Sequence, residues 1–394
     1  MRLKPSQLFT VYFPVLLIDF ALSSVLTNSS FYSSFLGLSS TFLGVLMAIA
    51  TAFFAFLAIP FGQLSDRVER RRMLYAACVL LGAASLGLPF CRNKIHLLAI
   101  FPVIGISMAL FWPAYEAWLS EQEEETKLVQ RVTLFNLFWS IGVTLGPAVS
   151  GYLYQDTNPF SPFYLSVALC LFTIVTLFSH KSKFASHTTE TSSETIQTLF
   201  PSPAVRKTYL NLARCANFAS WFGLGVLRRL SPKLTLEMGI PTQTYGNFML
   251  TLGGAQTLAF LVLGTGFSTR WHYRFSPLLI VQGLAILSFI GMWRVQNFFL
   301  WTAAFALIGL SAAFTYFSSL YYGLDKYTDK GNKSGWHESI LGFGILLGPL
   351  LGGIAVDLGL GPQSPYLMCA AMVAIAIGVE MLITSKNQLS ADAL

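Results

Sequence analysis

Long apolar runs recur from one end of the chain to the other, and they constrain the fold more than any other feature of the sequence. About twelve runs of roughly 20 residues can be distinguished, and a helix of roughly 20 residues crosses the hydrocarbon core of a bilayer. Runs such as 41–62 and 368–384 are apolar on almost every side of a helix, so they face lipid or one another rather than water. The sequence therefore predicts an all-α membrane protein with twelve transmembrane helices.

Composition supports the same fold class. Of the 394 residues, 54% are hydrophobic and only 11% are charged, whereas about 25% of the residues of a soluble domain are charged. The five cysteines stand singly in or beside apolar runs, so neither a disulfide framework nor a metal site is expected. The predicted helices begin near Phe9, Ser40, Met73, Ile95, Val132, Phe163, Thr208, Thr244, Ser276, Asn297, Gly335 and Gln363.

Basic residues are distributed unevenly between the two sides that twelve helices create. If both termini are cytoplasmic, most of the 25 lysines and arginines fall in cytoplasmic loops, as the positive-inside rule requires. The basic N-terminal segment resembles the start of a signal peptide but lacks a small-residue cleavage site, so we predict a retained first helix. We expect a multi-pass protein of the cell inner membrane. Because the net charge of +7 is dispersed among short loops, no nucleic-acid partner is expected.

An internal repeat predicts that the chain consists of two halves. The fifth and eleventh predicted helices share three glycines and a proline at a constant offset of 202 residues. The pairs are Gly142 and Gly344, Gly146 and Gly348, Pro147 and Pro349, and Gly151 and Gly353. We predict one six-helix bundle over 1–180, a solvated cytoplasmic linker over 181–207, and a pseudo-symmetric second bundle over 208–394. The alternative is that glycine and proline are simply common in membrane helices.

The loop after the second predicted helix carries a short motif. It reads GQLSDRVERRR from Gly62 onward, and it resembles the signature loop of the major facilitator superfamily: glycine, any residue, leucine, a small residue, aspartate and arginine, then a basic cluster. Gly62 would permit a tight exit from the helix, and Asp66 could face a helix N-terminus. Arg67 and Arg70 would hold the loop at the anionic inner surface. The alternative is that this cluster only sets the topology.

The resemblance covers essentially the whole chain and implies a secondary transporter. Such proteins work by alternating access of two six-helix bundles around a central cavity. It further implies a monomer in the lipid bilayer that carries a small-molecule solute, with protons as the expected coupling ion and no cofactor. The segment GVTLGPAVSG resembles a glycine-proline motif of the family's antiporters. However, Phe101 stands where the family's fourth-helix arginine is expected, which weakens a drug/proton antiport interpretation.

Asp19 is the strongest single candidate for a functional side chain. It lies about ten residues into the first predicted helix, and Ser23 and Thr27 follow on the same face. A charged group at mid-membrane costs roughly 2.5 to 3.5 kcal/mol on insertion scales. We therefore expect Asp19 to bind and release a proton or to attract a cationic group. The alternative is a structural carboxylate that is hydrogen-bonded between helices.

The seventh predicted helix carries polar and aromatic residues at three-, four- and seven-residue steps. These are Arg214, Asn217, Trp221 and Arg228. On a regular helix they form one stripe, which should line an aqueous cavity. Arginine binds carboxylate and phosphate groups bidentately, so the stripe favours an anionic or zwitterionic solute. Alternatively, Arg214 and Arg228 extend to the two opposite membrane interfaces.

Charged residues also gather at the predicted cytoplasmic ends of the fourth and eleventh helices, which meet in the family when the inner gate closes. We predict a gate network there, and its candidate members are Glu116, Arg131, Lys333, His337 and Glu338. Asn136 lies 202 residues before Glu338, which makes the two a pseudo-symmetric pair and Asn136 a candidate site residue. The alternative is that charged and aromatic residues simply mark the membrane interface.

Three functions are compatible with these features, and none of them is enzymatic. The sequence contains no GxSxG, HExxH or Walker motif, so we expect neither an enzyme nor an ATP-driven pump. The favoured function is proton-coupled transport of a small organic anion or zwitterion. An amphiphile or drug exporter is the second, supported by the aromatic content of 14%. The third is a membrane sensor that keeps the fold and transports nothing.

Overall fold

The computed structural model describes residues 11–65, 67–120, 128–155, 157–178, 202–264, 271–324 and 330–386. The side chains of 116–117, 119–120, 128–132, 324 and 330–335 are excepted. In chain order the long helices are α2 (Phe13–Phe35), α3 (Ser40–Ser65), α4 (Arg70–Gly87), α5 (Lys94–Ser120), α6 (Leu128–Leu153), α7 (Ser161–Phe178), α8 (Pro203–Gly225), α10 (Thr242–Leu263), α11 (Ser276–Arg294), α12 (Phe298–Leu324), α13 (Lys330–Ala355) and α14 (Ser364–Lys386).

These helices confirm the predicted membrane fold. Eleven of them are long and apolar enough to cross a bilayer. The remaining one, α8, is less apolar because Arg206, Lys207 and Arg214 lie on it. Every helix begins within five residues of its predicted start. Each apolar run folds as a helix because lipid offers no partner for backbone N–H and C=O groups, which must therefore bond within the segment.

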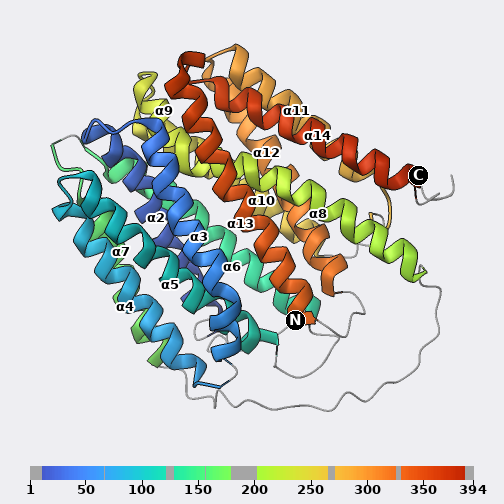
Figure 1. The fold of residues 1–394 in the computed structure, drawn as a ribbon, viewed down its shortest axis with the longest axis horizontal. Helices are drawn as coiled ribbons and strands as arrows, with labels where there is room; N and C mark the ends of the chain where they lie inside the picture. Colours follow the sequence, from blue (N-terminus) through green and yellow to red (C-terminus); the bar gives the residue numbers. More distant parts are fainter. Residues whose placement is uncertain are drawn as a thin grey trace.

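The helices form two groups that meet along a central interface. Helices α2 to α7 pack against one another, as do α8 and α10 to α14, while α3 with α13 and α6 with α10 join the groups. Figure 1 shows the first group in blue to green and the second in yellow to red, lying side by side. The division into one bundle over 1–180 and a second over 208–394 remains a prediction, except for the start of the second, which is corrected below.

The repeated glycines make equivalent contacts in the two halves. Gly142 of α6 packs against the backbone of α2 at Leu16, and Gly344 of α13 packs against α8, where an added Cβ would lie 2.8 Å from the Phe218 oxygen. The next pair, Gly146 and Gly348, touches the same two helices one turn further on. Such close approach requires glycine because any side chain would collide with backbone. The predicted repeat is therefore present in the packing as well as in the sequence.

The third glycine of each half packs across the interface. Gly151 of α6 touches the carbonyl of Thr242, the first residue of α10, and Gly353 of α13 touches the carbonyl of Ser40, the first residue of α3. Ser40 and Thr242 are themselves 202 residues apart. We call this end of the molecule, where α3 and α10 begin and α6 and α13 end, the closed end.

A carboxylate also bridges the two groups of helices at the closed end. Asp357 lies in the short helix η6 (Val356–Leu360) that follows α13. Its carboxylate accepts hydrogen bonds from the backbone N–H groups of Ser40 at 3.3 Å and Thr41 at 2.8 Å. It thus caps the N-terminus of α3 from the other half of the protein, where unpaired N–H groups favour negative charge.

Two sequence-based details need correction. The linker was predicted to extend to residue 207, but α8 already begins at Pro203, where the Ser202 hydroxyl accepts a hydrogen bond from Val205 N at 3.3 Å. A serine cap followed by proline is a helix start rather than a linker feature. Gly62 was expected at a tight helix exit, yet α3 continues through it to Ser65. An added Cβ there would make only an ordinary contact with Pro113, at 3.5 Å.

Candidate functional site

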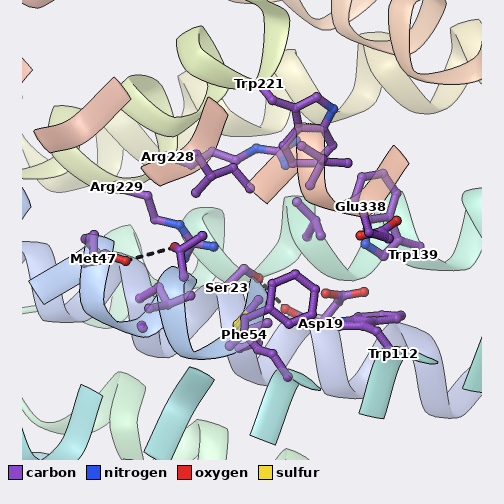
Figure 2. Close-up of a pocket in the computed structure, with 18 of the residues that line it drawn as sticks. Asp19, Ser23, Met47, Phe54, Trp112, Trp139, Trp221, Arg228, Arg229 and Glu338 are labelled. Carbon is purple, nitrogen blue, oxygen red and sulfur yellow. Dashed lines mark hydrogen bonds between the residues drawn. The ribbon is translucent and has the colours of Figure 1, made fainter. Parts of the chain in front are cut away.

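A cavity of about 100 Å³ lies between the two groups of helices. That space holds several water molecules or one small chemical group. Its wall contains side chains from both halves of the chain, and its polar and aromatic members are Asp19, Ser23, Thr27, Thr51, Phe54, Trp112, Phe135, Trp139, Trp221, Arg228, Arg229, Tyr316 and Glu338. Figure 2 shows side chains of the two halves converging on this space from opposite sides. A central position between two bundles is where secondary transporters bind their solutes.

Asp19 extends from α2 into this cavity (Figure 2). Its side chain is 3% exposed, and its Oδ2 atom has no hydrogen-bond partner among the described residues. The adjacent α6 helix approaches closely because Gly142 lies beside the Asp19 Cβ, 3.0 Å from where a Cβ would be. A buried carboxyl oxygen with an unused acceptor position can take a proton or a cationic group.

The two arginines of the cavity lie on a π-helical segment. Helix α8 ends at Gly225 and continues as the π-helix η4 (Val226–Leu230). Wider turns of this kind are rare and are frequent at functional sites. Two carbonyls of this segment accept side-chain hydrogen bonds: Leu227 O from the Tyr245 hydroxyl at 3.1 Å, and Arg229 O from the Ser30 hydroxyl of α2 at 2.6 Å. This segment brings two consecutive arginines to the cavity wall.

The guanidinium groups of these arginines have unused donors. One terminal nitrogen of Arg228 donates to Gln256 Oε1 at 2.8 Å, and its guanidinium carbon lies 5.8 Å from the ring centroid of Trp221. Its Nε atom is buried and has no partner in the described part of the chain. Arg229 makes no side-chain hydrogen bond to any described residue. Both groups therefore retain donors with which they could bind an anion.

Stacked aromatic rings form one wall of the cavity. Trp139 of α6 lies against Tyr316 of α12, with ring centroids 5.4 Å apart and planes inclined by 13°. Trp221 completes the group, at 6.1 Å from Trp139 and 5.9 Å from Tyr316. Because Trp139 belongs to one half of the chain and the others to the second, this wall crosses the interface. It offers an apolar surface next to the charged groups.

Opposite charges occupy different parts of the cavity. In the view of Figure 2, Arg228 and Arg229 lie toward the left, whereas Asp19 and Glu338 lie toward the right. All four residues line the same space. The site can therefore hold an anionic group near the arginines and a proton or a cationic group near the carboxyls.

Three predicted site residues lie elsewhere. Asn136 and Asn217 are fully buried, and both amide atoms of each lack a partner among the described residues, but neither lines the cavity. Arg214 is half-buried and lies within electrostatic reach of His337 rather than in the cavity wall. Trp221 and Arg228 of the expected stripe do line the cavity. Arg214 and Asn217 lie on the regular part of α8, before the π geometry that begins at Val226.

The predicted gate is described only in part. His337 is buried, its Nδ1 lies 2.9 Å from the Ser319 hydroxyl, and its ring meets Tyr316 edge-on at 4.9 Å. Glu338 lines the cavity. The side chains of Glu116, Arg131 and Lys333 lie outside the described residues, so the network that they would form remains a prediction.

The arginines of the signature loop differ in exposure and in contacts. Asp66 lies outside the described residues, Arg67 is exposed, and Arg70 is only 7% exposed. Arg71, another member of the basic cluster, donates to the carbonyls of Leu177 at 2.7 Å and Phe178 at 2.8 Å. It thereby satisfies the last carbonyls of α7 and ties that helix to α4.

Two buried polar pairs were not predicted from the sequence. Gln256 holds Arg228, as described above. Glu380 on α14 is fully buried and accepts a hydrogen bond from Gln282 of α11 at 2.8 Å. All of these residues stand in apolar runs, so a scan for every polar residue in such runs, rather than for stripes alone, would have found them.

The chain is similar in sequence to known membrane transporters. A sequence profile of the Major Facilitator Superfamily matches residues 8–334. The uncharacterised MFS-type transporter YqjV of Bacillus subtilis is 24% identical over 374 residues, covering 90% of this chain and 87% of that protein. An uncharacterised MFS-type transporter of Methanocaldococcus jannaschii is 32% identical over 129 residues, which span 32% of each chain. Another Bacillus subtilis relative is likewise matched over only 28% of its length.

Two further similarities concern a named activity and the fold. The quinolone resistance protein NorA of Staphylococcus aureus is 23% identical over 164 residues, or 41% of this chain and 42% of that protein. A crystal structure of a bacterial homologue of the human lysosomal transporter Spinster, inward-facing and occupied, superimposes over 99% of this chain and 100% of that chain, with a TM-score of 0.74 at 14% identity. The unoccupied form of that protein gives a TM-score of 0.68.

Proposed function

The chain belongs to the major facilitator superfamily, and we propose that it is a proton-coupled secondary transporter of a small organic anion or zwitterion. The observation that carries this proposal is the separation of charge in the cavity. Asp19 from one half of the chain faces a space that Arg228 and Arg229 line from the other half. A solute that touches both sides bridges the two bundles, so its binding can bias their relative movement.

Electrostatics supplies a simple coupling of proton and solute. When Asp19 is ionised, its negative charge offsets part of the positive charge of Arg228 and Arg229 in the same cavity. When Asp19 is protonated, that offset is removed and an anion binds the arginines more strongly. By linkage, a bound anion must then favour protonation of Asp19 to the same extent. Protons and an anionic solute would therefore travel together.

The proposed setting is the inner membrane of a cell, with the protein as a monomer and both termini in the cytoplasm. The basic loops on the side of the N-terminus support this orientation, and the bacterial relatives support an inner membrane. The closed end then faces outward. Val295, between α11 and α12 at that end, is 48% exposed, whereas the five native cysteines are buried or half-buried. The variant Val295→Cys should react with an impermeant maleimide added to intact cells, and labelling only after lysis would reverse the orientation.

A second candidate function is export of amphiphiles or drugs. The aromatic wall formed by Trp139, Trp221 and Tyr316 suits flat apolar molecules. The similarity to NorA, whose name records quinolone resistance, points the same way. Loss of the gene should then sensitise cells to hydrophobic toxins, a result that the first proposal does not predict.

Reconstitution into proteoliposomes tests the main proposal. Uptake would be measured across a panel of organic acids, amino acids and hydrophobic cations, with and without an inwardly directed proton gradient. We expect at least one anion or zwitterion to accumulate only when the gradient is present. Accumulation that ignores the gradient would overturn proton coupling, and selective movement of hydrophobic cations would favour the exporter. No flux of any compound would leave the sensor function as the best account.

A further inference from the structure

A buried carboxyl group that is not part of the cavity wall lies between two helices of the second half. Glu380 of α14 is 0% exposed, and Gln282 of α11 is 1% exposed. The Nε2 atom of Gln282 donates to Glu380 Oε2 at 2.8 Å and lies 3.4 Å from the Leu278 carbonyl. Neither residue lines the transport cavity. The mechanism proposed above does not use this pair.

Two oxygen atoms of the pair are left over. Glu380 Oε1 and Gln282 Oε1 are both fully buried, and neither has a hydrogen-bond partner in the described parts of the chain. Buried polar atoms are normally paired, since water is not available to replace the missing bond. Here two buried acceptors have no donor among the described residues, and they belong to groups that are already joined by the other hydrogen bond.

Among the described residues, no lysine or arginine forms an ion pair that would balance an ionised Glu380. The titratable neighbour from α8 is the Cys215 thiol, which donates to the carbonyl of Ala376 one turn before Glu380. On α13, which also packs against α14, Glu338 lines the cavity instead. An ionised carboxylate would therefore be buried without compensation, which is costly.

Protonation of Glu380 would both neutralise the buried charge and supply the donor that the two unpaired oxygens lack. A carboxylic acid is neutral, and its hydroxyl is a donor that the carboxylate lacks. If Oε1 carries the proton, it can donate to Gln282 Oε1 while Oε2 keeps the existing bond from Nε2. The acid and the amide then form two parallel hydrogen bonds, and both unpaired oxygens are satisfied.

We propose that Glu380 is a proton-binding site separate from the transport cavity, held as a neutral acid–amide pair with Gln282 that fastens α14 to α11. The proton is bound tightly and is not the transported one. That second part rests on the proposed function: α11 and α14 belong to the same bundle, which moves as a unit in alternating access, so the pair is not opened during the cycle. Asp19, in contrast, faces the interface that opens.

Infrared spectroscopy of the purified full-length protein tests the protonation. The difference spectrum between the wild type and Glu380→Gln, recorded at neutral pH, should contain the carbonyl stretch of a protonated carboxylic acid. The substituted amide has nearly the same shape and supplies an N–H donor toward Gln282 Oε1, so it mimics the neutral acid. A difference spectrum with only the bands of an ionised carboxylate would overturn the proposal.

Thermal unfolding in detergent gives a second measurement. Glu380→Gln should unfold at the wild-type temperature near neutral pH, whereas Gln282→Leu, which removes the amide partner, should unfold at a clearly lower temperature. Raising the pH should lower the unfolding temperature of the wild type more than that of Glu380→Gln, because only the wild type can lose this proton. Marked destabilisation by Glu380→Gln together with a normal Gln282→Leu would contradict the pair.

Transport measurements separate this inference from the proposed function. Neither spectroscopy nor unfolding needs a known solute, so the acid–amide pair stands or falls independently of whether flux is found. If flux is found, Glu380→Gln should keep the proton-driven accumulation and its pH profile. Loss of proton-driven accumulation in a stably folded Glu380→Gln protein would show that this proton exchanges during transport, and would overturn its assignment as a retained one.

Discussion

Helices α2 and α8, the first of each half, make equivalent packing contacts but present different kinds of side chain to the cavity. At the offset of 202 residues, Asp19 of α2 corresponds to Trp221 of α8. Each lies against the equivalent glycine, with its Cβ 3.0 Å from where a Cβ of Gly142 or Gly344 would be. One position presents an acid to the cavity and the other an aromatic ring. The two halves keep equivalent residues where helices touch and differ where the helices face the cavity.

The two helices also differ in how they end. Helix α2 remains α-helical to Phe35, whereas α8 changes at Val226 into the π-helix that carries Arg228 and Arg229. The positions of α2 that correspond to these arginines are Leu26 and Thr27, which are uncharged. A symmetric scaffold therefore supports an asymmetric site, negative on one side and positive on the other. We propose that divergence within the repeat, rather than the repeat itself, determines which solute binds.

The largest expected effect comes from removing the charge on α2. Asp19→Asn should abolish concentrative uptake, because an amide cannot carry the coupling proton, while exchange down a solute gradient should partly survive. The matched change in α8, Trp221→Phe, keeps an aromatic ring and should leave accumulation intact. Proteoliposome uptake with a proton gradient measures both. Unchanged accumulation in Asp19→Asn would return this residue to a structural role.

Substitution of the repeated glycines tests whether the two halves pack in the same way. Gly146→Ala and Gly348→Ala each place a methyl group against the backbone of the neighbouring first helix, at Ser24 N (2.6 Å) and at the carbonyl of Phe222. Overpacking of this kind costs about 1–3 kcal/mol, so both variants should unfold at lower temperature in detergent. Gly254→Ala, where a Cβ would meet nothing within 4 Å, is the control. A strong effect in only one half would break the equivalence.

The positive side of the cavity should control affinity rather than coupling. Arg228→Gln removes a charged donor that could bind the solute, and such a bond contributes about 1.5–3 kcal/mol, so apparent affinity should fall roughly 10- to 150-fold. The exposed Arg67 provides a control, since Arg67→Gln leaves the cavity unaltered. Competition binding of the transported anion measures the change. Wild-type affinity in Arg228→Gln would assign this arginine to structure.

The smallest effect is expected at the π-helix itself. Tyr245→Phe removes the hydroxyl that donates to Leu227 O, and loss of one such hydrogen bond costs about 1 kcal/mol. We expect a small drop in unfolding temperature and a weaker apparent affinity for the anion, because the segment that positions Arg228 and Arg229 loses a support. If only stability changes, the π geometry does not depend on this bond.

The helical scaffold could be predicted well from the sequence because few backbone conformations are possible in lipid. Apolar runs must become helices, and close helix contacts select glycine, so both the twelve helices and the repeat could be recognised. The helix start at Pro203 was missed because Ser202 and Pro203 were interpreted as linker residues rather than as a cap. The site was predicted less completely. Asp19 and Arg228 were found because charges in apolar runs are rare.

What escaped prediction depends on contacts between distant segments. The change to π geometry at Val226 accompanies hydrogen bonds from Ser30 and Tyr245, which periodicity does not reveal. Arg214 and Asn217 were expected in the cavity wall because helical spacing gives the face of a residue but not the extent of the cavity along the helix, and they lie elsewhere. Glu380 was overlooked because it stands alone in an apolar run without a polar stripe.

The bond between Asp357 and the first residues of α3 has a consequence for the balance of conformations. This carboxylate caps a helix of the opposite half, so any movement that separates Gly353 from Ser40 must break it. At an exposed position such a cap is worth about 1 kcal/mol, which corresponds to a roughly fivefold change in the ratio of two states. The position 202 residues earlier is Gln155, which carries no charge. This cap therefore weights the resting population toward the form closed at this end, and the corresponding position of the first half supplies no such charge.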